Sequence, residues 1–531
     1  MQKVTVLNPR IADDAPRASL APELKALAGA RVAFVDNSKV NADLFLSRIR
    51  PLLEQTYGVR PGRTVRKLAP KDELTHADLE ELASYDAVVQ CFGDCGTSTS
   101  MTVADGVSLE RLGIPTVTVI STAFARAARA QAAGRGMGDL PVIEVPHPMH
   151  TAPAPVVLER AEAVVSDLVG ALTRRNTTSI ATREELRDAE VTLDASPEAV
   201  QEFFFEQGWT DGLPVAPPTH AAVRAMLAAV RRDAAQEIGP IPPRMRMASL
   251  EKLAVNAVMA GCRPEYFPVV LAAIEAMLDP ECRLYGIRTA TNNGTPLVIV
   301  NGPAARKLDI NSGGNVFGQG WRANATIGRA LQLVLRNAGG DMPGETDMST
   351  QGQPGKFTFC IAENEEDSPW TPFHVERGFS PDDSTVTVIG ASAGHNVFTY
   401  GCETGTEILE HVVGAMTALG HNNVIFPTGP LVVFGPEHAN VLARDGYDKP
   451  KIREYLFRHA RIPLSRFRER TVRGLKHRRA RWFEQAGDPD HIGVADDPSH
   501  INIVVAGGPG IHSQFVPTSF SYSAVTRRIA D

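Results

Sequence analysis

Short apolar runs alternate with amphipathic stretches along the first 175 residues of the chain. Apolar runs that are bounded by loops predict buried strands, and they lie at 30–36, 85–92, 114–122 and 140–147. Apolar residues at helical spacing predict helices at the end of 37–57 and within 75–85, 101–113 and 154–173. Strands that alternate with helices are joined by right-handed crossovers, so we expect an α/β domain with a doubly wound parallel sheet.

The pattern changes after residue 175. Residues 173–199 are polar and carry no sustained apolar stripe, which is typical of a linker, and residues 208–219 are dense in glycine and proline. We therefore predict an α/β domain at 1–175, a linker and Gly/Pro-rich connecting segment at 176–245, and two further parts at 246–388 and 389–531.

An internal repeat relates the last two parts. Three segments recur in the same order at offsets of about 134 to 144 residues: 261–278 as 401–419, 295–308 as 429–442, and 357–364 as 501–508. The repeat predicts a C-terminal α+β domain built from two pseudo-symmetric halves whose strands share one core.

Composition limits the classes of function. A chain of 531 residues with 43% apolar and 22% charged residues is typical of a multidomain globular protein, and its net charge of -7 gives no basic footprint for nucleic acid. No run approaches the roughly 18 uncharged apolar residues of a membrane span, so we expect no membrane partner. The first residues lack the order of a signal peptide, and six cysteines at unrelated spacings are typical of reduced thiols, so we expect a cytoplasmic protein.

Two of the cysteines lie where the strand at 85–92 passes into a helix, in VVQCFGDCGTSTSM (88–101). The carboxyl ends of strands form the functional edge of a doubly wound sheet, and a helix N-terminus stabilises a thiolate. Cys95 is therefore our candidate nucleophile, with Asp94 beside it. Cys91 is either a packing residue or a resolving thiol. The alternative for Cys95 is a small residue that fits a tight glycine-rich turn.

Residues 95–122, CGTSTSMTVADGVSLERLGIPTVTVIST, resemble the segment around the active selenocysteine in component B of glycine, sarcosine and betaine reductases. They are more similar to the UGSC (seleno)protein family, which is named after its Sec/Cys-Gly-Ser-Cys motif. FVDNSKVNAD (34–43) and LGIP (112–115) fit the same family, and the resemblance covers roughly residues 25–173.

The resemblance implies a reaction at carbon. In the reductases the selenol attacks the α-carbon of an activated substrate, expels the leaving group and leaves an adduct that another component resolves. Cys95 falls on the selenocysteine position. However, the second motif cysteine is Ser98 here, and the next cysteine of component B aligns with Met101. Redox chemistry would then need Cys91, a cysteine of the second region, an external thiol or a reductase protein.

Other candidates surround this loop in the sequence. Lys39 follows the first strand and is expected at the same sheet edge as Cys95, where it would hold an anionic substrate or support the thiolate; the alternative is an exposed loop lysine. His147 and His150 follow the last strand and are either acid–base groups or turn residues. The remaining candidate substrate contacts in this region are Asn37, Ser38, Asn41, Gly96, Thr97 and Ser98.

The second region offers weaker candidates. Cys262 and Cys402 occupy equivalent places in the repeat and form a possible second thiol pair, or else they are buried packing residues. Polar loops predict further substrate contacts at Asn292, Asn293, His374, Arg377, His395 and Asn396. NSGGNVFGQG (311–320) lacks the ending of a Walker A loop and no GxGxxG follows a strand of the first region, so no nucleotide cofactor is indicated. No HExxH, CxxC or EF-hand pattern occurs, so we expect no metal.

These observations favour an enzyme in which Cys95 forms or breaks a carbon–heteroatom bond on a small polar, carboxylate-bearing substrate. A thiol oxidoreductase that uses Cys95 with Cys91 or a distant cysteine is the second enzymatic alternative. A small-molecule binding or assembly module is the non-enzymatic one. From the general frequency among metabolic enzymes, we expect a homo-oligomer.

Overall fold

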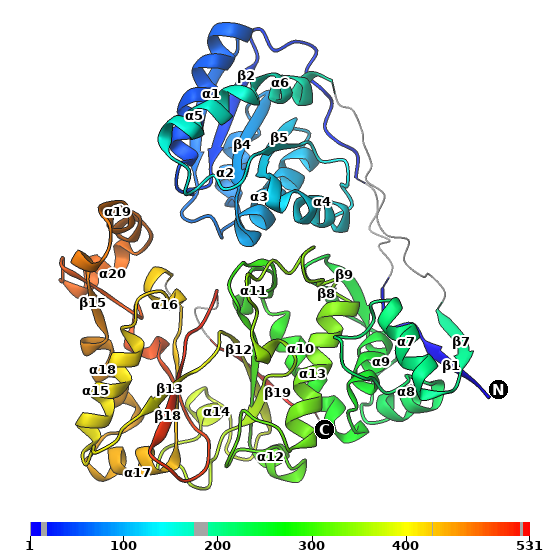
Figure 1. Ribbon diagram of the computed structural model, residues 1–531, viewed down its shortest axis with the longest axis vertical. Coiled ribbons are helices and arrows are strands. Elements are labelled where there is room, and N and C mark those ends of the chain that lie inside the picture. Colours follow the sequence, from blue (N-terminus) through cyan, green and yellow to red (C-terminus); the bar gives the residue numbers. More distant parts are fainter. Residues whose placement is uncertain (1, 12–17, 175–188, 427, 521–523, 531) are drawn as a thin grey trace.

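The computed structural model describes residues 2–11, 18–174, 189–426, 428–520 and 524–530. Figure 1 shows two lobes, an N-terminal domain (residues 18–174) above and a larger C-terminal region below. Helix α3 and its neighbours lie on the side of the N-terminal domain that faces the C-terminal region. No helix in these described ranges has the length and apolar content to cross a bilayer.

The N-terminal domain is built on a five-stranded parallel sheet in the order β3-β2-β4-β5-β6, which confirms the predicted fold class. Its strands are β2 (Arg31–Asp36), β3 (Arg60–Arg66), β4 (Ala87–Gly93), β5 (Thr116–Ser121) and β6 (Val142–Val145). The first strand along the chain lies between the second and the third, so the direction of winding reverses between β2 and β4. Such a switch point opens a crevice at the carboxyl ends of the two strands.

Helices cover both faces of this sheet. One face packs on α1 (Ala42–Tyr57), α5 (Ala154–Ala163) and α6 (Val165–Thr173). The other packs on α2 (His76–Leu82), α3 (Gly96–Arg111) and α4 (Ala125–Gly134). Strands β2, β4 and β5 are buried on both faces, which is why they read as continuous apolar runs in the sequence.

Some predicted bounds of the N-terminal domain were wrong. The helix expected at 101–113 begins at Gly96, and the helix expected at 154–173 is divided into two at Val164. Strand β3 was missed because its sequence, RPGRTVR, belongs to a polar edge strand. Helix α4 was missed because its alanines give little apolar contrast.

The domain boundaries also differ from the predicted ones. Strand β1 (Lys3–Leu7) pairs antiparallel with β7 (Glu190–Asp194), and Val6 and Leu7 join the core of the C-terminal region. The N-terminal domain is therefore inserted between two paired strands of the other region, which local patterns cannot reveal. The predicted linker at 176–245 is structured over its described part, 189–245, with α7 (Pro197–Glu206), α8 (His220–Leu227) and β8 (Glu237–Ile241). Residues 175–188 lie outside the described residues.

The C-terminal region contains two four-stranded sheets that share a core. The first has the order β11-β10-β12-β19 and the second β13-β18-β14-β17. Apolar residues of both sheets meet in one cluster, among them Leu297, Ile389, Val433 and Val516. The strands are β10 (Thr295–Asn301), β11 (Cys360–Ala362), β12 (Thr385–Ala391), β13 (His395–Phe398), β14 (Leu431–Phe434), β17 (Asn502–Val505), β18 (His512–Val516) and β19 (Val525–Arg528).

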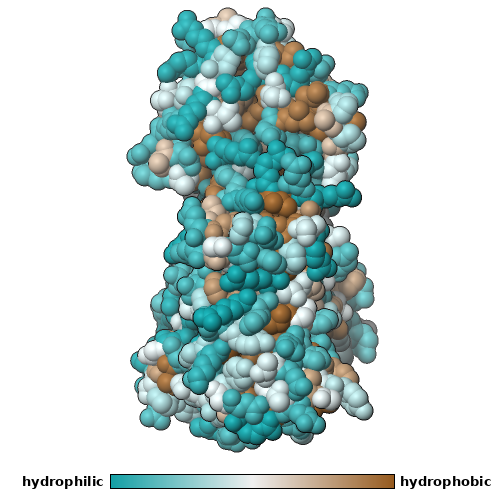
Figure 2. Space-filling view, turned by 90° about the vertical axis from the view of Figure 1, so that its left-hand side faces the viewer, coloured by the Kyte–Doolittle hydropathy of each residue, from teal (hydrophilic) through white to brown (hydrophobic). Residues whose placement is uncertain are grey.

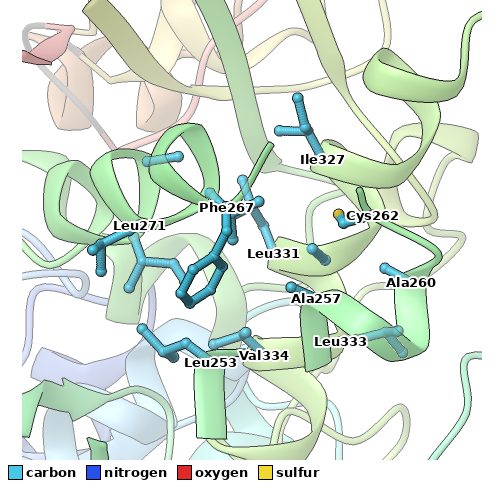
Figure 3. Close-up of a cluster of buried hydrophobic side chains, with 14 of the residues drawn as sticks. Leu253, Ala257, Ala260, Cys262, Phe267, Leu271, Ile327, Leu331, Leu333 and Val334 are labelled. Atoms are coloured by element: carbon cyan, nitrogen blue, oxygen red, sulfur yellow. The ribbon is translucent and has the colours of Figure 1, made fainter. Parts of the chain in front are cut away.

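Helices flank the outer faces of the two sheets. The first sheet packs on α9 (Leu250–Ala260), α10 (Phe267–Met277) and α13 (Arg322–Asn337), whose apolar side chains surround Cys262 in Figure 3. The second packs on α15 (Gly405–Met416), α17 (Pro436–Arg444) and α18 (Lys449–His459). A small lobe beyond α18 holds β15 (Arg461–Pro463), α19 (Glu469–Arg478), α20 (Ala480–Ala486) and β16 (His491–Gly493).

The pairing of strands is of the same kind in both sheets. Strand β10 is parallel to β11 and antiparallel to β12, and β14 is parallel to β17 and antiparallel to β18. Pairing alone does not establish a repeat, which stays a prediction. The expected division at residue 388 is not kept, because β19 near the C-terminus adds to the first sheet beside β12.

Candidate active site

The site begins where the sheet reverses its winding. Strand β2 ends at Asp36 and β4 ends at Gly93, and the loops that follow these adjacent strands carry Lys39 and Cys95. The loops leave in opposite directions because α1 and α3 cover opposite faces of the sheet. Lys39 and Cys95, which the sequence predicted at one edge of the sheet, therefore lie at the same edge.

Cys95 is the N-cap of α3. Its backbone is extended, with φ of -161°, and its Sγ accepts a hydrogen bond from the Ser98 amide at 3.4 Å. Ser98 Oγ lies 3.1 Å from Sγ and accepts hydrogen bonds from the amides of Asp94 and Cys95 at 3.0 and 3.1 Å. A sulfur atom thus takes the place of the oxygen that usually caps a helix, at the end where a negative charge is most stabilised.

Lys39 supplies the positive charge beside this sulfur. Its Nζ donates to Ser98 Oγ at 3.4 Å across the crevice. Burial raises the pKa of the Cys95 thiol, but the Lys39 charge and hydrogen bonds from Lys39 and Ser98 outweigh it, so the pKa is lowered. The side chain of Cys95 is partly exposed, and a partly exposed thiol of lowered pKa is the setting of a nucleophile.

The loop after β2 is held in shape by its asparagines. Asn37 Nδ2 donates to the Phe92 carbonyl at 2.8 Å, and Asn41 Nδ2 donates to the Met149 carbonyl at 2.8 Å. Ser38 and Asn41 have φ of 62° and 73°, and Asn41 tolerates this left-handed backbone better than most residues. The role of Asn37, Ser38 and Asn41 as substrate contacts stays a prediction; their hydrogen bonds tie neighbouring loops together, and Asn37 Oδ1 accepts from the Lys39 amide at 3.1 Å.

Asp94 gathers the two candidate histidines. Its buried carboxylate lies 2.9 Å from His147 Nδ1 and 2.8 Å from His150 Nδ1, and it accepts from the backbone amides of Met149 and His150. Burial opposes its ionisation, but hydrogen bonds from His150, Ser121 and these amides prevail and lower the pKa of Asp94. An ionised carboxylate only accepts hydrogen bonds, so each imidazole donates from Nδ1 and keeps Nε2 for other partners.

Cys91 lies in the hydrophobic core instead of the crevice. Its thiol is fully buried and donates to the Ala42 carbonyl at 3.7 Å, and burial raises its pKa well above the usual range. All six cysteines are free thiols. Of the two roles that the sequence left open for Cys91, this position favours packing.

The C-terminal region closes over the start of α3. Helix α11 (Leu284–Thr289) ends against Gly96, where an added Cβ would lie 1.7 Å from the Thr289 carbonyl oxygen and 3.0 Å from Met348 Cβ. Thr97 and Ser98 are buried in this contact zone. Glycine is required at 96 because the backbone of another domain occupies the space of its side chain.

Residues 5–174 match the model of the UGSC family. The match covers about a third of the chain, and residues 18–174, which lie within it, are called the UGSC domain below. No curated protein and no solved structure matches the chain. The similarity to component B of the glycine, sarcosine and betaine reductases stays a prediction.

Further contacts join the UGSC domain to the rest of the chain. Tyr285 Oη donates to Gln131 Oε1 at 2.7 Å, and Arg283 pairs with Asp72 at 3.2 Å. Arg470, on α19, donates from Nη2 to Asn41 Oδ1 at 3.3 Å and to the His150 carbonyl at 3.2 Å. The contacts of Asp72, Asn41 and His150 lie on loops that follow strands of the sheet, at the edge that carries Cys95, so the candidate site is formed between two domains.

The structure brings two of the six polar candidates of the second region toward this edge. Asn292 and Asn293 follow α11, and their carbonyls accept from Ser349 Oγ and Gln353 Nε2. Their neighbours Thr289 and Met348 are the residues that contact Gly96. Asn292 and Asn293 thus stand beside the site.

The other four candidates lie elsewhere. The short helix α14 (Phe373–Glu376), which contains His374 and is followed by Arg377, lies in the lower part of Figure 1. Arg377 donates to Thr526 Oγ1 at 2.6 Å. His395 and Asn396 lie on β13, where Asn396 lines a pocket of about 440 Å³ with the glycine loop 507–510. None of these four is brought to the edge of the sheet that carries Cys95, and their role as substrate contacts stays a prediction.

Cys262 and Cys402 do not meet. Cys262 lies in the core around α9, α10 and α13, where burial raises its pKa to about 12, and Cys402 packs against the separate core of the second sheet. The possible second thiol pair is therefore not present. Among the described ranges, no group of three or more His, Cys, Asp or Glu side chains could hold a metal ion.

Sequence reasoning missed α19 as a contributor to the site. The signal was a run of eight Lys or Arg and one acidic residue between 466 and 481, in a chain of net charge -7. Such a run is usually a solvated surface, and only the contacts of Arg470 show which part of the molecule it faces.

Proposed function

We propose that the protein is an enzyme in which the Cys95 thiolate attacks a carbon that bears a nitrogen or sulfur leaving group. The substrate is a small polar molecule with a carboxylate. The observation that carries the proposal is the capping of α3 by the Cys95 sulfur atom with Lys39 beside it, because this arrangement lowers the pKa of a partly exposed thiol.

The first half of the reaction forms a thioether. The Cys95 sulfur forms a bond to the carbon, the bond from the carbon to the leaving group breaks, and the leaving group departs with the electron pair. An imidazolium of His147 or His150, held at Nδ1 by Asp94, donates the proton from Nε2 to the leaving group. The Lys39 ammonium pairs with the carboxylate of the substrate.

The second half regenerates the enzyme. A thiol from a small molecule or another protein attacks the same carbon, forms a new carbon–sulfur bond and releases the Cys95 thiolate. Its proton returns to the imidazole. The sequence of steps is a double displacement, which balances without an oxidant or a reductant.

The buried position of Cys91 favours this version over an internal disulfide. A resolving thiol must reach the sulfur that it attacks as a thiolate, whereas burial raises the pKa of Cys91 and holds it in the core. A redox version would have to use an external thiol.

The test is the rate of iodoacetamide labelling from pH 5 to 9, with peptide mapping to separate the six thiols. We expect labelling of Cys95 to be half-maximal well below the ordinary value of about 8.5. Cys402 is the internal control, because it is also partly exposed but burial and nearby Glu407 and Glu410 raise its pKa. An ordinary or raised midpoint at Cys95 would contradict the proposal.

A second measurement separates the alternatives. Incubation with α-amino and α-thioether carboxylates should add the mass of the carbon fragment to Cys95, and Cys95→Ala should abolish the adduct. A reversible loss of two hydrogens with no adduct would favour the oxidoreductase. Ligand affinity that is unchanged in Cys95→Ala, with no adduct in the wild type, would favour a binding module.

A further inference from the structure

Helix α19 places a basic surface over the mouth of the Cys95 site. At its N-terminal end, Arg470 binds Asn41 and the His150 carbonyl, which belong to two of the loops that frame the crevice. At its C-terminal end, the charge of His477 acts on Asp36, the last residue of β2. Both ends of one helix are therefore directed at the same edge of the UGSC domain.

The cations of this segment divide into two groups. Arg479 is buried and pairs with Asp496 at 2.5 Å, and Arg478 lies 5.9 Å from the centre of the Phe426 ring, so these two serve the fold. Arg470, Arg473 and Lys476 are exposed. Figure 2 looks onto the side of the molecule that carries α19, where hydrophilic residues cover much of both lobes and some apolar residues lie at the waist between them.

Arg473 is the cation whose role the fold does not explain. It makes no hydrogen bond or ion pair with the residues that the structure describes. Residues 470, 473 and 477 are separated by three and four positions, so they share one face of the helix. Arg473 therefore lies on the face that Arg470 and His477 turn toward the crevice.

Positive charge exceeds negative charge at this mouth. The cationic groups are Lys39, Arg66, Arg470, Arg473 and Lys476. The acids near them are already engaged, since Asp36 pairs with Arg66 at 3.5 Å and Asp94 binds two histidines. Asp43, in the first turn of α1, and Glu469, four positions before Arg473 on α19, are the remaining acids of this edge. The surplus is suited to an anionic molecule with more than one negative group.

We propose that α19 provides a second anion-binding subsite in which Arg473, supported by Arg470, holds a second carboxylate or a phosphate of the substrate. This inference rests on the proposed function of Cys95. It narrows the substrate to a dianion that has one negative group at Lys39 and another at Arg473, with the reacting carbon between them at Cys95.

Alkylating agents of different charge test the subsite without knowledge of the substrate. Iodoacetamide is neutral, iodoacetate carries one negative charge and 2-bromosuccinate carries two. For each agent the second-order rate constant at Cys95 is measured in the wild type and in Arg473→Gln, at low ionic strength. The rate constant of the mutant is divided by that of the wild type for each agent, so that the intrinsic reactivity of the agent cancels.

We expect Arg473→Gln to slow the labelling of Cys95 by 2-bromosuccinate about tenfold and by iodoacetate about threefold. The rate of labelling by iodoacetamide should stay within about twofold of the wild-type rate. Arg470→Gln should act in the same direction. Arg481→Gln is the matched control, because Arg481 is exposed in the same lobe but its charge acts on Asp497. The effects should shrink at about 0.5 M salt if they arise from charge.

Equal slowing of all three agents, or no slowing of the anionic ones, would overturn the subsite. A protection experiment distinguishes a carboxylate subsite from a phosphate subsite. Succinate and inorganic phosphate are compared as competitors that slow the labelling of Cys95 by iodoacetate. The rate of labelling by iodoacetamide, which is neutral, measures the reactivity of Cys95 independently of the anion-binding subsite. A raised thiol pKa would reject the proposed function, and the charge series, run at pH 9, would still decide the subsite.

Discussion

Cys95 and Cys262 follow similar sequence signals but have opposite chemistry. Each is next to glycine near the end of a helix or strand, yet the pKa of Cys95 is lowered and that of Cys262 is raised to about 12. Cys95 is itself the cap of α3, whereas Cys262 follows the left-handed Gly261 that ends α9 and turns into the core. A reactive thiol needs both the N-terminal end of a helix and a nearby cation, and glycine alone indicates neither.

Cys402 is a closer comparison for Cys95, because the two thiols differ in the charges of their neighbours more than in their exposure. Both thiols are partly exposed. Cys402 lies just before α15, but Glu407 and Glu410 of that helix face it in place of a lysine, and together with burial they raise its pKa. Of the four predictions below, three change one group beside Cys95 or Cys402, and one tests the carboxylate of Asp94, next to Cys95 in the chain.

The largest effect is expected from Ser98→Cys, which restores the family motif. The Ser98 oxygen lies 3.1 Å from the Cys95 sulfur, so a sulfur atom at 98 is placed to form a disulfide. Mild oxidation should remove two hydrogens from this variant and abolish Cys95 labelling, and a reductant should restore it. Ser100→Cys is the control, since the Ser100 hydroxyl donates to the Gly96 carbonyl instead. Full labelling of oxidised Ser98→Cys would contradict the geometry.

Lys39→Met should slow iodoacetamide labelling of Cys95 at pH 7 by about tenfold, because loss of an opposite charge raises a thiol pKa by about one unit. The measurement is the pH midpoint at Cys95, with the rate at Cys402 as an internal reference. Lys25→Met, at an exposed lysine of the same domain, is the matched control. If the pH midpoint of Cys95 labelling did not move, the lowered pKa would be due to the N-terminal end of α3 alone.

Asp94 should make stability depend on acid pH. Its pKa is lowered on folding, so its contribution is present above the unfolded value of about 4 and is lost as the pH falls below it. Between pH 5 and pH 2.5 the free energy of unfolding of the wild type should fall by about 2 kcal/mol more than that of Asp94→Asn. Denaturant titrations at both pH values measure it, and parallel losses would show that Asp94 is not the group responsible.

The smallest effect is expected from Glu410→Gln. Removal of one exposed negative charge near Cys402 should lower its pKa slightly and speed its labelling at pH 7 by about twofold. Cys95 serves as the unchanged reference. Slower labelling of Cys402 would mean that charge does not explain the difference between the two thiols.

Local signals predicted the parallel sheet without its edge strand β3, and a helix after Cys95 whose start was placed at 101 instead of Gly96. The strands around β4 are buried on both faces and leave continuous apolar runs, and the Gly, Thr and Ser residues after Cys95 mark a helix start. The sequence also selected Asp94, His147 and His150, but their shared hydrogen bonds depend on a loop more than fifty residues away. His374 and Arg377 were chosen for polarity alone, and the fold places them in other contacts.

Long-range features could not be predicted. The approach of Thr289 to Gly96 and of Arg470 to His150 joins parts of the chain that share no pattern. The position of Cys91 in the core could be inferred from the apolar run around it, which left two roles open. A basic run in an acidic chain was visible at 466–481, but its direction was not.

The pairing of β1 with β7 makes the N-terminal domain an insertion within the C-terminal region. Strand β1 belongs to the C-terminal region, so that region is encoded on both sides of residues 18–174. A protease that cut the chain once between residues 174 and 189 would leave the two fragments attached through β1 and β7. A gene that lost the codons for 18–174 would still encode both partners of that pair. Residues 18–174 therefore form an insertion whose removal would leave both strands of the β1–β7 pair in the chain.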